Sequence, residues 1–142
     1  MNIETIFNIE NGVLTGGDFR NVTHVEIPEG VTAIRRPGYT GLFERNHSLE
    51  TIIIPEGVEE IGYRTFFECH GLKAIVFPST LKIIGEYAFY NCKSLKSITI
   101  PEGIEKIGDN AFCACEELQT VVLPDSMKQI PKGVFSQCAK PL

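Results

Sequence analysis

Apolar and polar positions along this chain of 142 residues repeat every 23 residues. The period is carried by a column of phenylalanines and a column of cysteines: Phe43, Phe66, Phe89, Phe112 and Phe135, then Cys69, Cys92, Cys115 and Cys138. Asn46 takes the cysteine position in the first repeat. A fixed period of this length is typical of one supersecondary unit stacked on copies of itself. The pattern therefore predicts a solenoid of about five 23-residue coils.

Within each repeat, the local pattern predicts two short strands and a turn. Residues 98–100 are β-branched and alternate, which predicts a strand that Pro101 ends because proline cannot donate to a continuing ladder. A second extended piece follows in each coil, as at residues 58–61. The stretch from Gly108 to Cys115 predicts one helical turn, which would place Phe112 and Cys115 on the same side. We expect a β-rich coil with short helical or 3-10 turns.

Glycine opens this turn at Gly62, Gly85 and Gly108, whereas Pro131 takes the position in the last repeat. Proline has a negative φ, so the position does not require a left-handed residue. Close packing between coils is the better explanation for the glycines.

The first residues predict a cap. Asn11-Gly12 separates two apolar stretches, residues 7–9 and 13–14, which indicates a β-hairpin. We interpret the chain as a single domain, 1–142, with an N-terminal hairpin cap at 1–20 and repeats at 21–142. The last coil lacks a comparable cap, so we expect its edge to be exposed, paired with another chain, or continued in a longer protein.

The repeat unit, clearest at Leu95–Cys115, reads Leu-x-x-Ile-x-Ile-Pro-x-x-x-x-x-Ile-Gly-x-x-Ala-Phe-x-x-Cys and resembles the BspA-like leucine-rich repeat family. The segments 7–14 and 25–31 also look like the start of such arrays. The match covers about 120 of the 142 residues. It implies a leucine-rich repeat solenoid, a non-catalytic binding or adhesion scaffold, and a bacterial surface or secreted protein. Residues 1–7 carry no visible signal peptide, so localisation rests on the resemblance alone.

Composition and charge exclude other classes. The net charge of −5 and pI near 5.2 argue against nucleic acid, which needs a basic face. The sequence contains no run of 18 apolar residues, so it predicts no membrane-spanning helix. No Gly-x-Ser-x-Gly, phosphate-binding glycine loop or His-Glu-x-x-His is present, and we predict that the protein is not an enzyme.

The cysteine column suggests a disulfide or metal site, but spacing argues against both. Stacked coils place equivalent residues ~4.8 Å apart with parallel Cβ vectors, whereas disulfides need converging Cβ atoms roughly 3.5–4.5 Å apart. We predict free, buried thiols that serve packing. Cys113 lies outside the column, and we expect it to be more exposed, either as a surface residue without a role or as a modifiable thiol.

Two histidines, His47 and His70, share another column and are expected to stack. Zinc needs about four tetrahedral ligands, whereas Lys93 and Glu116 continue this column. We interpret the two histidines as solvated turn residues and predict no metal site and no cofactor.

Strand alternation predicts a binding face. If Leu49, Ile52 and Ile54 point to the core, the residues between them point outward. The outward columns are then Glu26, Ile53, Val76, Thr99 and Val122, and His24, Thr51, Ala74, Ser97 and Thr120. Such a mostly uncharged face with exposed Ile and Val favours a protein or glycan partner. The β-propensity of a self-pairing sheet is an equal alternative explanation.

The first repeat contains an insertion. Ile34 and Phe43 are nine positions apart, where Ile61 and Phe66 are five apart. The inserted segment contains Arg35, Arg36 and Tyr39. Loops inserted in one coil are often binding sites, and a tolerated bulge is the alternative.

We therefore expect a non-catalytic binding scaffold that recognises a protein or glycan through its outward strand face. The second hypothesis is a structural module that self-associates end to end through the C-terminal coil.

Overall fold

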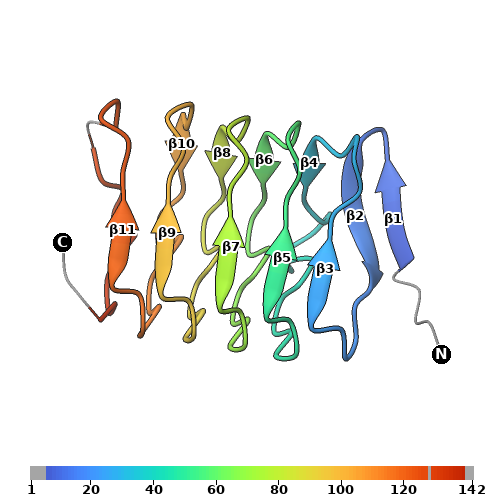
Figure 1. The fold of residues 1–142 in the computed structure, drawn as a ribbon, viewed down its shortest axis with the longest axis horizontal. Helices are drawn as coiled ribbons and strands as arrows, with labels where there is room; N and C mark the ends of the chain where they lie inside the picture. Colours follow the sequence, from blue (N-terminus) through green and yellow to red (C-terminus); the bar gives the residue numbers. More distant parts are fainter. Residues whose placement is uncertain (1–5, 128, 140–142) are drawn as a thin grey trace.

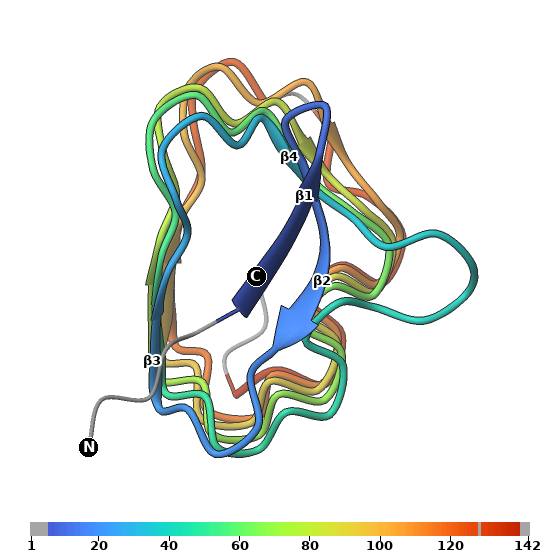
Figure 2. The ribbon, with the colours of Figure 1, turned by 90° about the vertical axis from the view of Figure 1, so that its right-hand side faces the viewer.

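The computed structural model describes residues 6–127 and 129–139, and these form one stack of coils along a single axis (Figure 1). Each coil has three sides when viewed down that axis (Figure 2). The front side carries β3 (His24–Glu26), β5 (Thr51–Ile53), β7 (Ala74–Val76), β9 (Ser97–Thr99) and β11 (Thr120–Val122). The back side carries β1 (Ile6–Glu10), β2 (Val13–Asp18), β4 (Ala33–Ile34), β6 (Glu60–Ile61), β8 (Ile83–Ile84) and β10 (Lys106–Ile107). The solenoid of about five coils is confirmed.

The back sheet runs without interruption in the order β1-β2-β4-β6-β8-β10. Its strands from β2 onward are parallel, because every coil of the stack winds in the same direction. Ile34 lies opposite Ile61, and Ile61 lies opposite Ile84. The strands β1 and β2 form the predicted antiparallel hairpin around Asn11 and Gly12. This hairpin lies across the open end of the array (Figure 2). It supplies the N-terminal cap that a solenoid needs.

The front sheet is also parallel but is divided into two parts. The strands pair in the orders β3-β5-β7 and β11-β9, and β7 and β9 belong to separate sheets. The other neighbours keep the repeat register, with Ile52 opposite Ile75 and Val121 opposite Ile98. The interruption therefore lies on one side of the array only, between the third and fourth front strands.

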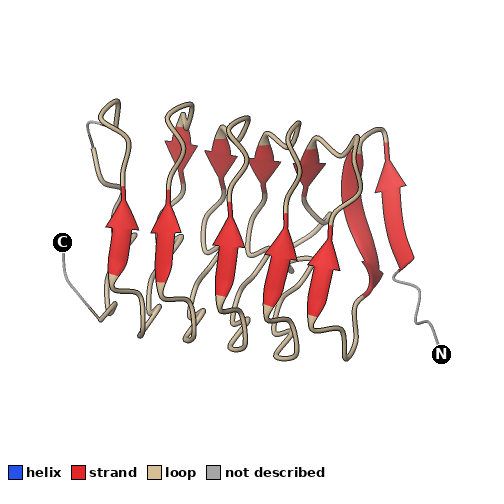
Figure 3. Cartoon of the chain, viewed as in Figure 1, coloured by secondary structure: helices blue, strands red, loops and turns tan. Residues whose placement is uncertain are grey.

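The third side, called here the turn side, differs from the helical turn expected from the sequence. The described residues contain strands and turns but no helix (Figure 3). Arg64 and Glu68 have φ of 54° and 56°, and equivalent residues in the next coil, Tyr87 and Asn91, have 56° and 57°. A helix needs an unbroken run of negative φ. Two left-handed residues in each of these coils therefore divide this segment into successive β-turns.

Backbone hydrogen bonds on the turn side explain this conformation. The amides of Arg64, Phe66 and Glu68 donate to carbonyl oxygens of the following coil, at 3.0, 2.7 and 2.7 Å. A helix would direct these amides into its own segment. The turn side thus joins neighbouring coils as a sheet does.

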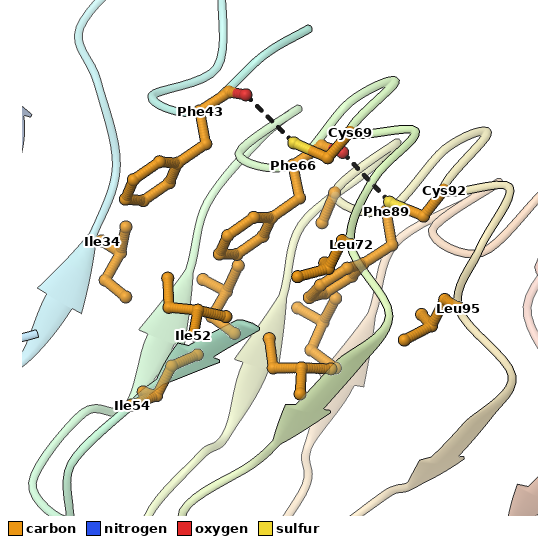
Figure 4. Packing of buried hydrophobic residues seen from close by; sticks show 14 of the residues in the cluster. Ile34, Phe43, Ile52, Ile54, Phe66, Cys69, Leu72, Phe89, Cys92 and Leu95 are labelled. Carbon is orange, nitrogen blue, oxygen red and sulfur yellow. Dashed lines mark hydrogen bonds between the residues drawn. The ribbon is translucent and has the colours of Figure 1, made fainter. Parts of the chain in front are cut away.

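Columns of like residues fill the interior (Figure 4). The rings of Phe43, Phe66, Phe89 and Phe112 stack in near-parallel pairs with centroids 5.0–5.1 Å apart, and all four are buried. Phe19 extends the column at 4.5 Å from Phe43. The sequence analysis did not include Phe19, because it lies 24 residues before Phe43 in the cap.

The predicted role of the turn glycines in close packing is confirmed. A Cβ on Gly108 would lie 2.3 Å from the backbone nitrogen of Glu86, and one on Gly85 would lie 2.7 Å from that of Tyr63. Neither glycine has a left-handed φ. Their small size, rather than their flexibility, lets adjacent coils approach.

Candidate binding face

The front sheet presents the outward columns that the sequence predicts. Leu49, Ile52 and Ile54 are buried, and Thr51 and Ile53 between them face away from the core. Ile53, Val76 and Val122 are exposed at 50%, 79% and 50%. The remaining predicted residues are exposed or, for Thr51, half-buried: His24, Glu26, Thr51, Ser97, Thr99 and Thr120. The structure therefore brings all nine predicted strand-face residues onto one surface, called here the front face.

The N-terminal edge of the front face is held by polar contacts. Nδ1 of His24 hydrogen-bonds to the hydroxyl of Thr51, the residue opposite it in the ladder. Nε2 of His24 lies 3.5 Å from a carboxylate oxygen of Glu26. The side chain of His24 is thus engaged by its neighbours, and the central part of the face is the apolar part.

Carboxylates line the edge of the front face where the strands end at proline. Glu56 accepts hydrogen bonds from the amide and hydroxyl of Ser79, at 3.0 and 2.8 Å. These bonds hold the pKa of Glu56 below its ordinary value. The position directly after proline is acidic in the other repeats, at Glu29, Glu56, Glu102 and Asp125. Ser79 takes this position in its own repeat, and it donates to the carboxylate of the preceding coil.

The insertion loop lies elsewhere. It projects from the array on the side away from β3 (Figure 2). Arg35 forms an ion pair with Glu60 of the next coil, and Arg36 and Tyr39 are exposed, Tyr39 at 88%. The structure therefore does not bring the two predicted sets of binding residues together.

An aromatic cluster on the turn side was missed in the sequence analysis. Its members are Tyr63, Phe67, Tyr87 and Tyr90. The Phe67 ring stacks on Tyr90 with centroids 4.9 Å apart, and the Arg64 guanidinium lies 3.8 Å from the Phe67 centroid. Phe67 and Tyr90 directly follow members of the phenylalanine column, which is the signal that could have indicated them. Because these groups stack on each other, we interpret the cluster as a stabiliser of the turn side.

The prediction that Cys113 is exposed was wrong. Its exposed fraction is 8%, and burial raises the pKa of its thiol. It follows Phe67 and Tyr90 in the column directly after the phenylalanines. Its amide and carbonyl are both bonded, the carbonyl to Asn91 of the preceding coil. The packing of neighbouring coils on the turn side therefore buries Cys113.

The remaining candidate chemistry is limited. All five cysteines are free, and three of the column, Cys69, Cys92 and Cys115, are fully buried. His47 and His70 stack as predicted, with ring centroids 4.4 Å apart. Among the described residues, no three His, Cys, Asp or Glu side chains gather so that they could hold a metal ion. The part of the chain that the structure describes has no helix that is long and apolar enough to span a membrane.

The protein-family model of the BspA-type leucine-rich repeat region matches residues 39–141 of this chain, in six copies. Comparison with curated proteins finds no match. Among solved structures, a leucine-rich repeat protein from Bacteroides ovatus is 37% identical with a TM-score of 0.71, over 97% of this chain and 44% of that chain. The T. pallidum leucine-rich repeat protein is 34% identical with a TM-score of 0.76, over 82% and 52%.

A leucine-rich cell surface protein from Faecalibacterium prausnitzii is 27% identical with a TM-score of 0.65, over 95% of this chain and 44% of that chain. The chain thus spans about half or less of the length of these three solved chains. The likeness concerns the repeat array and not the whole of those proteins.

Proposed function

Because this chain belongs to the BspA-type leucine-rich repeat family, we propose that it is a non-catalytic binding module that recognises a protein or glycan partner through its front face. Leucine-rich repeats of this kind are scaffolds typical of protein-binding and surface proteins. By analogy with the F. prausnitzii cell surface protein, we place the proposed partner outside the cell.

One observation carries the proposal. Three β-branched apolar side chains, Ile53, Val76 and Val122, are half or more exposed on the front face, and they belong to a single column of outward residues. Backbone pairing holds β5 against β7 and β9 against β11, so these side chains are displayed by ordered strands. Binding to such a surface costs little conformational entropy. The β-propensity of Ile and Val accounts for their presence in strands but not for leaving them uncovered.

The test uses a printed glycan array and an array of purified extracellular proteins as probes. A front-face variant, Ile53→Lys with Val76→Lys, is compared with the wild-type chain and with Ile83→Lys. Ile83 is exposed at 36% on the back strand β8 and serves as a matched control. Signals that the front-face variant loses and the Ile83 variant keeps support the proposal. Signals that persist in a folded front-face variant, or an absence of signals from the wild-type chain on both arrays, contradict it.

End-to-end assembly through the last coil is the second candidate. In the described part of that coil, Val121, Leu123 and Phe135 are only partly buried. Their counterparts one coil earlier, Ile98, Ile100 and Phe112, are 0–2% exposed. These side chains are thus less covered than their counterparts, and a second copy docked on this coil would bury them. Light scattering over a wide concentration range tests this, and a strict monomer throughout contradicts assembly.

A further inference from the structure

The division of the front sheet opens a groove between β7 and β9. On the back side, the same two coils remain joined, because Ile83 and Ile84 pair with Lys106 and Ile107. On the turn side, the amide of Phe89 donates to the carbonyl of Ala111 at 2.7 Å. The two coils are thus held together on two sides and separated on the third. Figure 1 shows the wider space between β7 and β9 than between the other front strands.

Phe77 explains where the division falls. It occupies the position before proline that holds Ile27, Ile54, Ile100 and Leu123 in the other coils. Its ring is partly buried and meets the ring of Phe89 edge-on, with centroids 5.7 Å apart at 70°. A phenyl ring in a column of aliphatic side chains needs more room along the stack. Phe77 therefore favours a wider separation of β7 and β9 than the aliphatic residues of the other coils would.

The groove is shaped and charged for one kind of ligand. It has a volume of about 620 Å³, and its apolar lining includes Ile75, Val76, Phe77 and Ile98. Val76 is 79% exposed, whereas Ile75 and Ile98 belong to the core, so the groove leads from the surface toward the interior. Its charged lining residues are two carboxylates, Glu56 and Glu102, and the described lining contains no basic residue.

We propose that this groove receives a single apolar side chain, of the size of leucine or phenylalanine, from a partner protein whose adjacent basic residue pairs with Glu102 and Glu56. The inference rests on the proposed function and names the anchor point of the front face. Apolar anchors inserted into pockets dominate protein interfaces, and the groove is large enough to admit a leucine or phenylalanine side chain. The outward columns contain no Tyr, Trp or Phe. The outward columns therefore lack an aromatic platform for a sugar ring. The aromatic ring in the groove lining, Phe77, is partly buried against Phe89, and the two carboxylates favour a basic protein segment over a neutral glycan.

The probe is a set of blocked peptides followed by methyl NMR. The peptide Gly-Lys-Phe-Lys-Gly is compared with Gly-Lys-Ala-Lys-Gly, which lacks the anchor, and Gly-Glu-Phe-Glu-Gly, which has the opposite charge. At millimolar peptide, the first should shift the methyl signals of Ile75, Val76 and Ile98, and the other two should bind about tenfold more weakly. Ile53 and Val122 lie on the same face outside the groove and serve as internal references. Shifts spread equally over all five methyl-bearing residues, or no shift, overturn the proposal.

Two variants sharpen the test. Phe77→Ile installs the residue of the neighbouring coils and should let β7 and β9 pair. Amide exchange in both strands should then slow, and the peptide response should disappear. Glu102→Lys lies on the exposed rim and should reverse the preference, so that the Glu-flanked peptide binds better than the Lys-flanked one. An unchanged preference in a folded Glu102→Lys chain contradicts the proposal whatever Phe77→Ile does.

The outcome can be separated from that of the proposed function. If the front-face lysine variant loses its array signals and Phe77→Ile retains them, the binding face stands and the groove is not its anchor. If methyl glucoside shifts the groove signals and the peptides do not, the groove is a sugar site and the protein-anchor proposal is wrong.

Discussion

The thiol of Cys69 donates a hydrogen bond to the carbonyl oxygen of Phe43 in the preceding coil, with 3.0 Å between Sγ and O (Figure 4). The same bond recurs from Cys92, Cys115 and Cys138 at 3.1–3.2 Å. In the first coil, the Nδ2 of Asn46 donates to the carbonyl of Phe19 at 3.1 Å. Asparagine and cysteine can therefore occupy the same position of the repeat, because each donates a hydrogen bond to a backbone carbonyl of the preceding coil. The column is a ladder of side-chain to backbone bonds as well as packing.

This ladder predicts the effect of Cys92→Ala. The variant removes a buried thiol and its bond to Phe66, and unfolding free energy should fall by about 1–2 kcal/mol. Cys113→Ala is the matched control, because this thiol is also buried but donates no hydrogen bond among the described residues. In urea unfolding, the fall in unfolding free energy should be smaller for Cys113→Ala than for Cys92→Ala. Equal losses in the two variants would show that the bond contributes nothing.

The buried thiols should be unreactive in the folded protein. Burial raises the pKa of Cys69 to about 12, and it also raises the pKa of Cys113. Since the thiolate is the reactive form, the aromatic disulfide reagent DTNB at pH 8 should label neither residue until denaturant is added. Peptide mapping after native labelling checks this. Rapid labelling of Cys113 in the folded chain would contradict its burial.

The phenylalanine column should be most sensitive at its centre. Phe89 is fully buried and stacks on Phe66 and Phe112 at 5.0 Å on both sides. Phe89→Ala should therefore cost about 3–5 kcal/mol. Phe135→Ala is the control, because Phe135 is partly buried and its ring lies 5.9 Å from its one described ring neighbour. A loss for Phe135→Ala as large as that for Phe89→Ala would mean that stacking on both faces is unimportant.

Much of this fold follows from periodicity. A spacing of 23 residues requires that equivalent residues stack, so the columns, the parallel strands and the outward position of Ile53 and Val76 could all be predicted. The hairpin followed from Asn11-Gly12, which has the positive φ at both residues that this turn needs. These features depend on local chemistry repeated in each coil.

The features that escaped prediction depend on contacts between coils. The left-handed φ of Arg64 and Tyr87 is stabilised by hydrogen bonds to the next coil, and neither residue type indicates it. The burial of Cys113 likewise comes from neighbouring coils. The groove lies beside Phe77, an aromatic ring in an otherwise aliphatic column. The sequence pattern of a single repeat does not show these contacts, because they form between one coil and the next.

The turn glycines offer a test with an internal control. A Cβ on Gly108 would lie 2.3 Å from the nitrogen of Glu86, a backbone atom that cannot move without separating the coils. Gly108→Ala should therefore cost about 1–3 kcal/mol or more through overpacking. In Gly103→Ala the nearest atom to the new Cβ is the carbonyl oxygen of Ser79 at 3.6 Å, an ordinary contact. Thermal unfolding should show a lower Tm for the first variant alone, and a matched fall in both would contradict the packing argument.

The stacked histidines predict a specific dependence of stability on pH. Burial first, then the charges of His47 and Lys93, lower the pKa of His70 below its ordinary value of 6.5, while Glu68 and Glu116 oppose this. The unfolded chain therefore binds a proton at this residue at a higher pH than the folded chain. The contribution of His70 is fully present above about pH 7 and declines as the pH falls through its unfolded pKa of about 6.5. Tm measured from pH 7.5 to 5 should fall more steeply in the wild-type chain than in His70→Gln. An unchanged slope in His70→Gln would show that this pair does not govern the response to acid.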